Sequence, residues 1–289
     1  MIELKGAYSE SLECIVFSPD GESLAAVGQW EGIIRWRLSE SGYPSEHVSI
    51  GYYYSNPKLE YSPNGAAIIG VSGPAIRIFD CSTLKRRVIS VPRRVHAWCV
   101  VDDTRIWIET DPSRACINLE SGKSEWRKRR NYSFQLRPVV RQPVSGLIAG
   151  GGDRQIEFRS AETGELQKSI LVPSLLGGMM SFSPDGRVVA TGQNTRLHIC
   201  DAELGDEITQ LRTGSRYHFT GIAFHPNGAV AATTSNDRIV RIWDCSTWKE
   251  ITTFTWDIGA MRSVAFAPDG LRMAAGSSEG RVMVWDVDF

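Results

Sequence analysis

Short runs in which apolar and polar residues alternate recur along the whole chain, and Gly, Pro, Asn or Asp separates one run from the next. The clearest run is Asp237-Arg-Ile-Val-Arg-Ile-Trp-Asp244, where a turn residue precedes residues that alternate with a period of two. This period predicts β-strands with one buried face. A helical spacing of apolar residues is nowhere sustained. The pattern therefore predicts an all-β protein of many short strands.

A second motif joins an aromatic residue to a Pro-Asp-Gly or Pro-Asn-Gly turn. Its copies are Phe17-Ser-Pro-Asp-Gly21, Tyr61-Ser-Pro-Asn-Gly65, Phe182-Ser-Pro-Asp-Gly186, Phe224-His-Pro-Asn-Gly228 and Phe266-Ala-Pro-Asp-Gly270. Pro fixes φ in such a turn and Gly supplies a positive φ. We expect each aromatic residue to end one strand and each turn to lead into the next strand.

The turn residues that precede the alternating strands give the length of the repeat. They are Glu31, Gly73, Asp111, Asp153, Asn194, Asp237 and Glu279. Their spacings are 42, 38, 42, 41, 43 and 42 residues. Seven copies of this length, each with several short strands, are typical of the blades of a β-propeller.

The turns and the dipeptides Trp243-Asp244 and Trp285-Asp286 resemble the WD-repeat β-propellers, and the resemblance covers essentially the whole chain. It implies seven four-stranded antiparallel blades in a single domain over residues 1–289. The Gly-His dipeptide of the family is missing from its expected place in every copy. This departure puts in question the hydrogen-bond network of Asp, His, Ser or Thr, and Trp that stabilises blades of this family.

The last copy of the repeat ends at Phe289 with its third strand, so it lacks a fourth. Residues Ile2 to Lys5 precede the first Pro-Asp-Gly turn by about one strand and a loop. We expect this N-terminal strand to pair as the outer strand of the last blade and to close the ring, which would leave no open sheet edge there.

Composition narrows the class of protein further. The 289 residues include 32 Lys and Arg and 33 Asp and Glu, a formal charge of -1. The start has no basic segment followed by an apolar one, and no apolar stretch approaches 18 residues. The six cysteines form no CxxC pair and have no histidine at the spacing of zinc ligands. We expect an intracellular, cytoplasmic protein with free thiols, no cofactor and no membrane partner.

Catalytic motifs are absent from the sequence, which contains no nucleophile elbow, P-loop, Rossmann fingerprint or His-Glu-x-x-His. The strands expected to be innermost, such as Glu13-Cys-Ile-Val-Phe17 and Arg262-Ser-Val-Ala-Phe266, are mostly apolar or small. The prediction is that the protein is not an enzyme. The alternative, a hydrolase or lyase at the mouth of the channel, would need polar groups that converge near the axis.

The loops that lead into the innermost strands carry aromatic residues and arginines, the types enriched at the energetic centres of protein interfaces. The candidate partner-binding residues are Trp30, Tyr52, Tyr53, Tyr54, Arg93, Arg94, Arg129, Arg130, Tyr132, Arg216, Tyr217 and Trp256. Trp30 is the exception, because it lies in the turn before the third strand of its copy and not in a loop that leads into an innermost strand. The alternative is that these rings only pack on neighbouring loops. The prediction is an interaction scaffold that binds a protein or peptide through this face.

Charge is distributed unevenly around the repeats. Residues 77–141 hold 15 basic and 7 acidic residues, a net of +8, whereas the rest of the chain has a net of -9. This sector of blades 2 and 3 could attract an acidic or phosphorylated ligand or a nucleic acid. A solvated arginine surface is favoured over a dedicated anion site, and a nucleic-acid partner is not expected.

Overall fold

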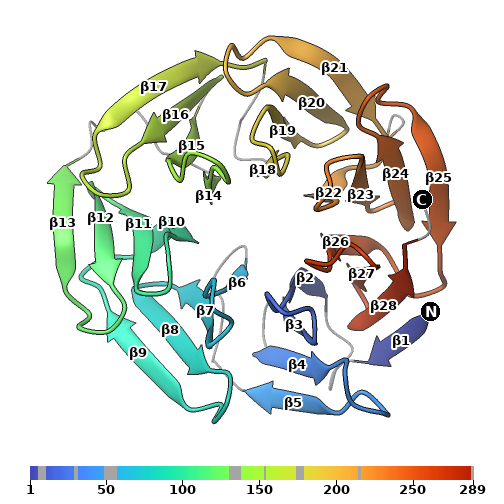
Figure 1. The fold of residues 1–289 in the computed structure, drawn as a ribbon, viewed down its shortest axis with the longest axis horizontal. Coiled ribbons are helices and arrows are strands. Elements are labelled where there is room, and N and C mark those ends of the chain that lie inside the picture. The colour runs from blue at the N-terminus through green and yellow to red at the C-terminus, as the bar shows by residue number, and fades with distance from the viewer. Residues whose placement is uncertain are drawn as a thin grey trace. The chain divides into compact units, whose positions relative to one another are not determined.

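The computed structural model describes residues 1–5, 11–28, 32–48, 57–129, 138–152, 154–173, 179–213 and 216–287. These residues form strands and turns without any helix, and the strands make seven four-stranded antiparallel sheets (Figure 1). The predicted fold class is therefore confirmed: the chain has the blades of a seven-bladed β-propeller. Within these residues, no helix is long and apolar enough to cross a membrane.

The contacts of the chain divide it into two compact units. Unit 1 comprises residues Met1–Ser72, Arg77–Arg87 and Arg216–Phe289, and unit 2 comprises Gly73–Ile76 and Val88–Ser215. Unit 1 thus holds blades 1, 6 and 7 and most of blade 2, and unit 2 holds blades 3, 4 and 5. That residues 1–289 are a single domain stays a prediction.

Each blade is a meander in which consecutive strands are neighbours. Blade 1 is β2 (Leu12–Phe17), β3 (Ser23–Gly28), β4 (Ile33–Arg37) and β5 (Ser45–Val48); blade 2 is β6 (Leu59–Tyr61), β7 (Ala67–Ser72), β8 (Ala75–Asp80) and β9 (Arg86–Ser90). Blade 6 is β22 (Phe219–Phe224), β23 (Val230–Ser235), β24 (Ile239–Asp244) and β25 (Glu250–Thr255); blade 7 is β26 (Met261–Phe266), β27 (Arg272–Ser277), β28 (Arg281–Asp286) and the N-terminal β1 (Ile2–Lys5).

The three blades of unit 2 follow the same plan. Blade 3 is β10 (Val95–Val100), β11 (Arg105–Thr110), β12 (Ser113–Asn118) and β13 (Ser124–Arg129). Blade 4 is β14 (Val139–Arg141), β15 (Ile148–Gly152), β16 (Gln155–Arg159) and β17 (Leu166–Leu171). Blade 5 is β18 (Met179–Phe182), β19 (Val188–Gln193), β20 (Arg196–Asp201) and β21 (Glu207–Arg212).

The Pro-x-Gly turns join the first strand of a blade to the second, as the sequence predicted. Gly21 has φ +73° and Gly186 has φ +70°, the left-handed region that glycine adopts without steric cost. In blade 1 the Asp20 carboxylate accepts hydrogen bonds from the Ser18 hydroxyl at 2.5 Å and from the Glu22 amide at 2.9 Å. These two hydrogen bonds to the carboxylate therefore stabilise the turn.

Blade 3 has no Pro-x-Gly turn, yet its first two strands are joined by an equivalent tight turn over residues 101–105. Asp102 replaces the missing motif, because its Oδ1 accepts the Thr104 amide and the Thr104 hydroxyl, each at 2.9 Å. One aspartate can thus supply the turn without proline or glycine.

The N-terminal strand completes blade 7, which confirms the prediction for this strand. β1 runs antiparallel to β28, with Ile2 opposite Val284 and Leu4 opposite Val282. Leu4 is buried in a hydrophobic cluster with Val282 and Val284. The last copy therefore takes its fourth strand from the other end of the chain.

The second strands of the blades form much of the core, and small residues allow blades to approach closely. In β3 the run from Leu24 to Val27 is fully buried, and in β27 Ala274 and Ala275 are fully buried. Ala26 and Ala274 lie in one hydrophobic cluster with Trp36, which is almost completely enclosed. The blades therefore present their loops on a rigid support.

Candidate partner-binding face

The first strands of blades 1, 3, 6 and 7 each contain a β-bulge near their beginning, since the pairing register shifts by one residue there. The extra residues are Glu13, His96, Thr220 and Arg262. A bulge bends the strand and redirects a side chain, and such bulges are enriched beside functional sites. We call the end of the blades where these strands begin the first-strand end, and the end that carries the Pro-x-Gly turns the Pro-x-Gly end.

In unit 1 the bulges of blades 6, 7 and 1 follow one another, because β22 lies beside β26 and β26 beside β2 (Figure 1). The Thr220 hydroxyl donates to the Met261 carbonyl at 2.9 Å, and the Ser263 hydroxyl donates to the Leu12 carbonyl at 3.1 Å. Each bond joins one blade to the next. The polar residues at the bulges are thus tied to the backbone of neighbouring blades.

Arg262 differs from Thr220 because its charged end is only loosely engaged. Arg262 Nε lies 4.0 Å from Glu13 Oε1, which is too long for a hydrogen bond, while the Ser11 hydroxyl donates to the same carboxylate oxygen at 2.6 Å. Nε is enclosed and makes no hydrogen bond with the described residues, and the side chain is 36% exposed. The partly exposed side chain therefore leaves the terminal nitrogens of Arg262 able to donate to a ligand.

Three of the predicted residues in unit 1 lie near these bulges in the chain. Arg216 and Tyr217 precede β22 and are exposed, and Tyr217 is 47% exposed. Trp256, which precedes β26, is half-buried and packs on Trp285, with ring centroids 4.7 Å apart, and on Phe254. Arg216 and Tyr217 are thus accessible for contact, whereas Trp256 has the packing role that the alternative interpretation expects.

The predicted residues of unit 2 that the structure describes are Arg93, Arg94 and Arg129, all on the surface. Arg93 and Arg94 are exposed in the loop before β10, and Arg129 is exposed at the end of β13. In the same blade the bulge residue His96 lies with Nε2 2.8 Å from the Asp111 carboxylate. Trp30, Tyr52, Tyr53, Tyr54, Arg130 and Tyr132 lie outside the described residues.

The basic sector is less available than its net charge of +8 indicates. Arg86 and Arg87 on β9 and Arg127 on β13 are exposed. However, Arg114 is buried against Glu109 and Glu157, and Arg105 is bound by Asp102 and Glu162. Part of the positive charge therefore neutralises acidic residues inside the blades and is not offered to a ligand.

The sequence contained a signal for the bulge residues that a search for apolar strands overlooks. Glu13, Thr220 and Arg262 each stand four residues before the aromatic residue of a Pro-x-Gly motif. A charged or hydroxylated residue at that position interrupts an otherwise buried strand. His96 occupies the same position in the first strand of blade 3. It cannot be found by counting back from a Pro-x-Gly motif, because blade 3 has no Pro-x-Gly turn.

The hydroxyls of this region serve hydrogen bonds within the chain. The hydroxyls of Ser11, Thr220 and Ser263 donate to acceptors of the chain, and their hydrogen bonds include none to a histidine or lysine base that could activate them. Burial raises the pKa of the Cys14 thiol, so a thiolate is not favoured there. Among the described residues, no group of three His, Cys, Asp or Glu side chains could hold a metal ion.

Comparison with protein families agrees with the fold. Residues 208–244 and 248–286 match the family described as WD domain, G-beta repeat. Together with the seven four-stranded blades, these matches confirm the resemblance to the WD-repeat β-propellers.

Several curated proteins are similar over part of their length. The telomerase protein component 1 of Rattus norvegicus is 22% identical over 83% of this chain and 9% of its own length. WD repeat-containing protein VIP3 of Arabidopsis thaliana is 24% identical over 52% of this chain and 51% of its own. The target of rapamycin complex subunit wat1 of Schizosaccharomyces pombe is 24% identical, over 49% and 45%. The chain spans at most about half of these relatives.

Proposed function

We propose that this chain is a non-catalytic interaction scaffold that binds a peptide segment of a partner protein at the first-strand end of unit 1. The observation that carries the proposal is Arg262, a guanidinium on a rigid strand whose charge is not satisfied by hydrogen bonds within the described residues. Exposed Arg216 and Tyr217, which precede the neighbouring strand β22, supply the residue types that dominate binding energy at interfaces.

The similar proteins support a role in assemblies. One is named as a component of telomerase and another as a subunit of the target of rapamycin complex. Proteins similar to this chain thus include some that are named as parts of complexes. We extend only this general role to the present chain, and its partner is defined by the chemistry of Arg262, Arg216 and Tyr217.

Affinity capture with quantitative mass spectrometry tests the proposal. The intact chain is compared with an Arg216→Ala/Tyr217→Ala variant and with Leu271→Ala, which removes an exposed apolar side chain from the Pro-x-Gly end of blade 7. We expect the double variant to lose the captured proteins at least tenfold and Leu271→Ala to retain them. Capture of the same proteins by the double variant and by Leu271→Ala would contradict the proposed binding face.

The exposed arginines on β9 and β13 support a second candidate, the binding of a polyanion. Charge reversal at Arg86, Arg94 and Arg129 separates the two candidates. Loss of partners on charge reversal, together with binding that falls steeply with salt, favours the polyanion. Binding that survives the reversal and fails in the Arg216→Ala/Tyr217→Ala variant favours the peptide face.

A further inference from the structure

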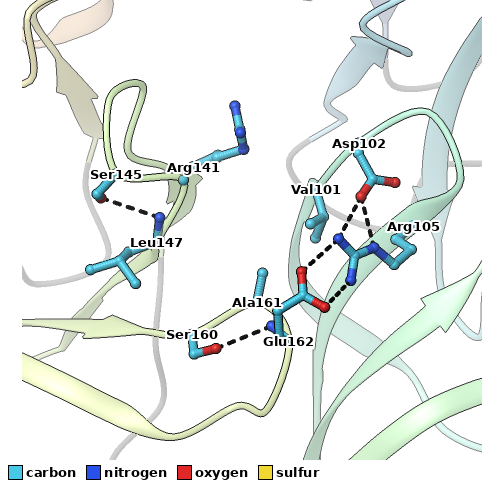
Figure 2. A pocket seen from close by; sticks show the side chains of 10 residues that line it. Val101, Asp102, Arg105, Arg141, Ser145, Leu147, Ser160, Ala161 and Glu162 are labelled. Carbon is cyan, nitrogen blue, oxygen red and sulfur yellow. Dashed lines mark hydrogen bonds and ion pairs between the residues drawn. The ribbon is translucent and has the colours of Figure 1, made fainter.

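A cavity of ≈ 300 Å³ opens at the Pro-x-Gly end of unit 2, at the opposite end of the blades from the first-strand end (Figure 2). Three turns form it: the β10–β11 turn with Asp102 and Arg105, the β14–β15 turn with Arg141, and the β16–β17 turn with Glu162. Its volume is at the lower limit for small-ligand pockets. The cavity thus has room for a single side chain or a small molecule.

Arg105 fixes one side of the cavity by joining two blades. Its guanidinium donates to both oxygens of Glu162, at 2.6 and 2.7 Å, and to Asp102 at 2.7 Å. The pKa of Arg105 is raised above its ordinary value by these hydrogen bonds with Glu162 and Asp102. Two blades are therefore held at a fixed separation by a bidentate ion pair.

This arrangement engages every carboxylate oxygen of the cavity in at least one hydrogen bond. Both oxygens of Glu162 accept from Arg105, Asp102 Oδ2 accepts from Arg105, and Asp102 Oδ1 accepts from Thr104. Figure 2 shows the Glu162 carboxylate turned toward Arg105 and away from the rest of the cavity. A ligand that brings hydrogen-bond donors would find no carboxylate oxygen here that is not already bonded to the chain.

The donors of the cavity, in contrast, remain open. Arg141 extends from the neighbouring strand without touching the Arg105 cluster, and it makes no hydrogen bond or ion pair with the described residues (Figure 2). Ser160 Oγ accepts the amides of Glu162 and Thr163, so its own proton is not donated within the described residues. The cavity therefore offers donors, five of them in one rigid guanidinium.

Gly146 makes room for the guanidinium of Arg141. It has φ +68°, and a Cβ built there would lie 3.3 Å from a terminal nitrogen of Arg141. A side chain at this position would strain the turn and push the guanidinium aside. The turn thus lets Arg141 lie over its backbone at the edge of the cavity.

We propose that this cavity binds a carboxylate on a short apolar stem, held in a bidentate manner by Arg141 between the walls formed by Val101, Leu147 and Ala161. The planar fork of arginine matches a carboxylate. A phosphate dianion is less suited, because the lining residues have only one uncommitted cation and two carboxylates nearby. The glutamate side chain of a peptide has the required length and charge.

The probe for the test is glutamate capped at both ends, with capped glutamine as its neutral counterpart. Titration of ¹⁵N-labelled protein follows the arginine Nε–H signals, and Arg141→Gln assigns the signal of Arg141. We expect capped glutamate to shift that signal saturably, and capped glutamine and inorganic phosphate to bind at least tenfold more weakly. Equal binding of capped glutamate and glutamine, or tighter binding of phosphate, would overturn the proposal.

Matched variants separate a binding role from a general effect of charge. Arg141→Gln should weaken binding at least tenfold, and Arg141→Lys should restore part of it. Arg187→Gln is the control, because Arg187 lies in the β18–β19 turn of the next blade with a side chain that is 86% exposed. Each variant is first shown by thermal melting to be folded, and unchanged affinity in Arg141→Gln would refute the site.

A further arm distinguishes a peptide from a free metabolite as the source of the carboxylate. Propionate carries the stem and the charge without a peptide backbone. Capped glutamate that binds several-fold more tightly than propionate supports a peptide side chain. Equal binding of the two assigns the same Arg141 site to a free small carboxylate. The site lies apart from the proposed peptide face in unit 1, so either proposal can fail alone.

Discussion

The indole N–H of Trp243 donates a 2.9 Å hydrogen bond to the Thr233 hydroxyl, and both residues are buried in blade 6. This bond is the part of the family's stabilising network that persists without the Gly-His dipeptide. In blade 7, 42 residues further along the repeat, Trp285 occupies the position of Trp243 and Ala275 that of Thr233. Within the described residues the Trp285 indole N–H has no hydrogen-bond partner.

Removing the acceptor in blade 6 should destabilise the protein. Thr233→Ala leaves the buried Trp243 N–H unsatisfied, which costs about 1–3 kcal/mol in the free energy of unfolding. Urea unfolding at neutral pH measures the change. Thr253→Ala, at an exposed position of β25 in the same blade, is the control and should leave the unfolding free energy nearly unchanged. Equal effects of the two substitutions would argue against the hydrogen bond.

Adding an acceptor in blade 7 should have the opposite effect. Ala275→Ser places a hydroxyl where Thr233 stands in blade 6, within the copy that lacks one. We expect a gain of about 1 kcal/mol in the free energy of unfolding, the usual contribution of a buried hydrogen bond. The same urea titrations detect it. A loss of stability would show that the serine cannot be accommodated beside Met273 and Met283.

The N-terminal strand should contribute strongly to stability because its leucine is buried. Leu4→Ala leaves a cavity beside Val282 and Val284 and should cost about 2–5 kcal/mol. Deletion of residues 1–6 should lower the melting temperature further, since it also exposes the edge of β28. Lys5→Ala, at an exposed position of the same strand, is the control. An unchanged melting temperature after the deletion would contradict the pairing of β1 with β28.

The sequence was sufficient for the blades because their determinants are local. The glycine after Pro-Asp determines the conformation of each such turn, and the alternation of the strand that contains Trp243 shows which of its faces is buried. The contacts that define the candidate sites are not local. Arg105 meets Glu162 across 57 positions and Arg262 meets Glu13 from the opposite end of the chain. No periodicity within one repeat encodes which residue of the next blade a side chain reaches.

The Asp237 turn should make stability depend on pH. Burial raises the pKa of Asp237, but hydrogen bonds from Arg241, at 2.7 Å, and from Ser235 lower it more, so the pKa lies below its ordinary value. The folded protein therefore binds this proton more weakly than the unfolded chain. The carboxylate stabilises the fold above its ordinary pKa of about 3.9 and loses this contribution as the pH falls below that value.

Asp237→Asn tests this dependence. The variant should be less stable than the original protein by about 1–3 kcal/mol at pH 7, because Arg241 loses a charged partner. The difference should shrink as the pH is lowered toward 3. Urea unfolding at the two pH values measures it, with Asp286→Asn on the exposed end of β28 as the control. A difference that stays constant with pH would show that Asp237 does not titrate in this range.

The thiols should fall into two reactivity classes. Burial raises the pKa of Cys116 and of Cys200 to about 12, and Cys99 is buried as well. Cys14, Cys81 and Cys245 are partly exposed, although burial also raises the pKa of Cys14 and Cys81. A thiol that is both enclosed and protonated reacts slowly. Titration with a chromogenic disulfide at pH 8 should modify all six cysteines in denaturant. In the folded protein, rapid modification of Cys116 or Cys200, located by peptide mapping, would contradict the core of blades 3 and 5.

Arg262 should matter for binding and very little for stability. Its Nε makes no hydrogen bond with the described residues and stands 4.0 Å from Glu13, so the pair contributes at most about 1 kcal/mol. Arg262→Met keeps the apolar stem and should change the free energy of unfolding by about 1 kcal/mol or less. The same variant should weaken capture of the partner at least tenfold, because an arginine that donates to a ligand is typical of an interface centre. Thermal melting and quantitative capture on one preparation separate the two effects. Retained partners, or a large loss of stability, would place Arg262 in the framework of the blades and not in the binding face.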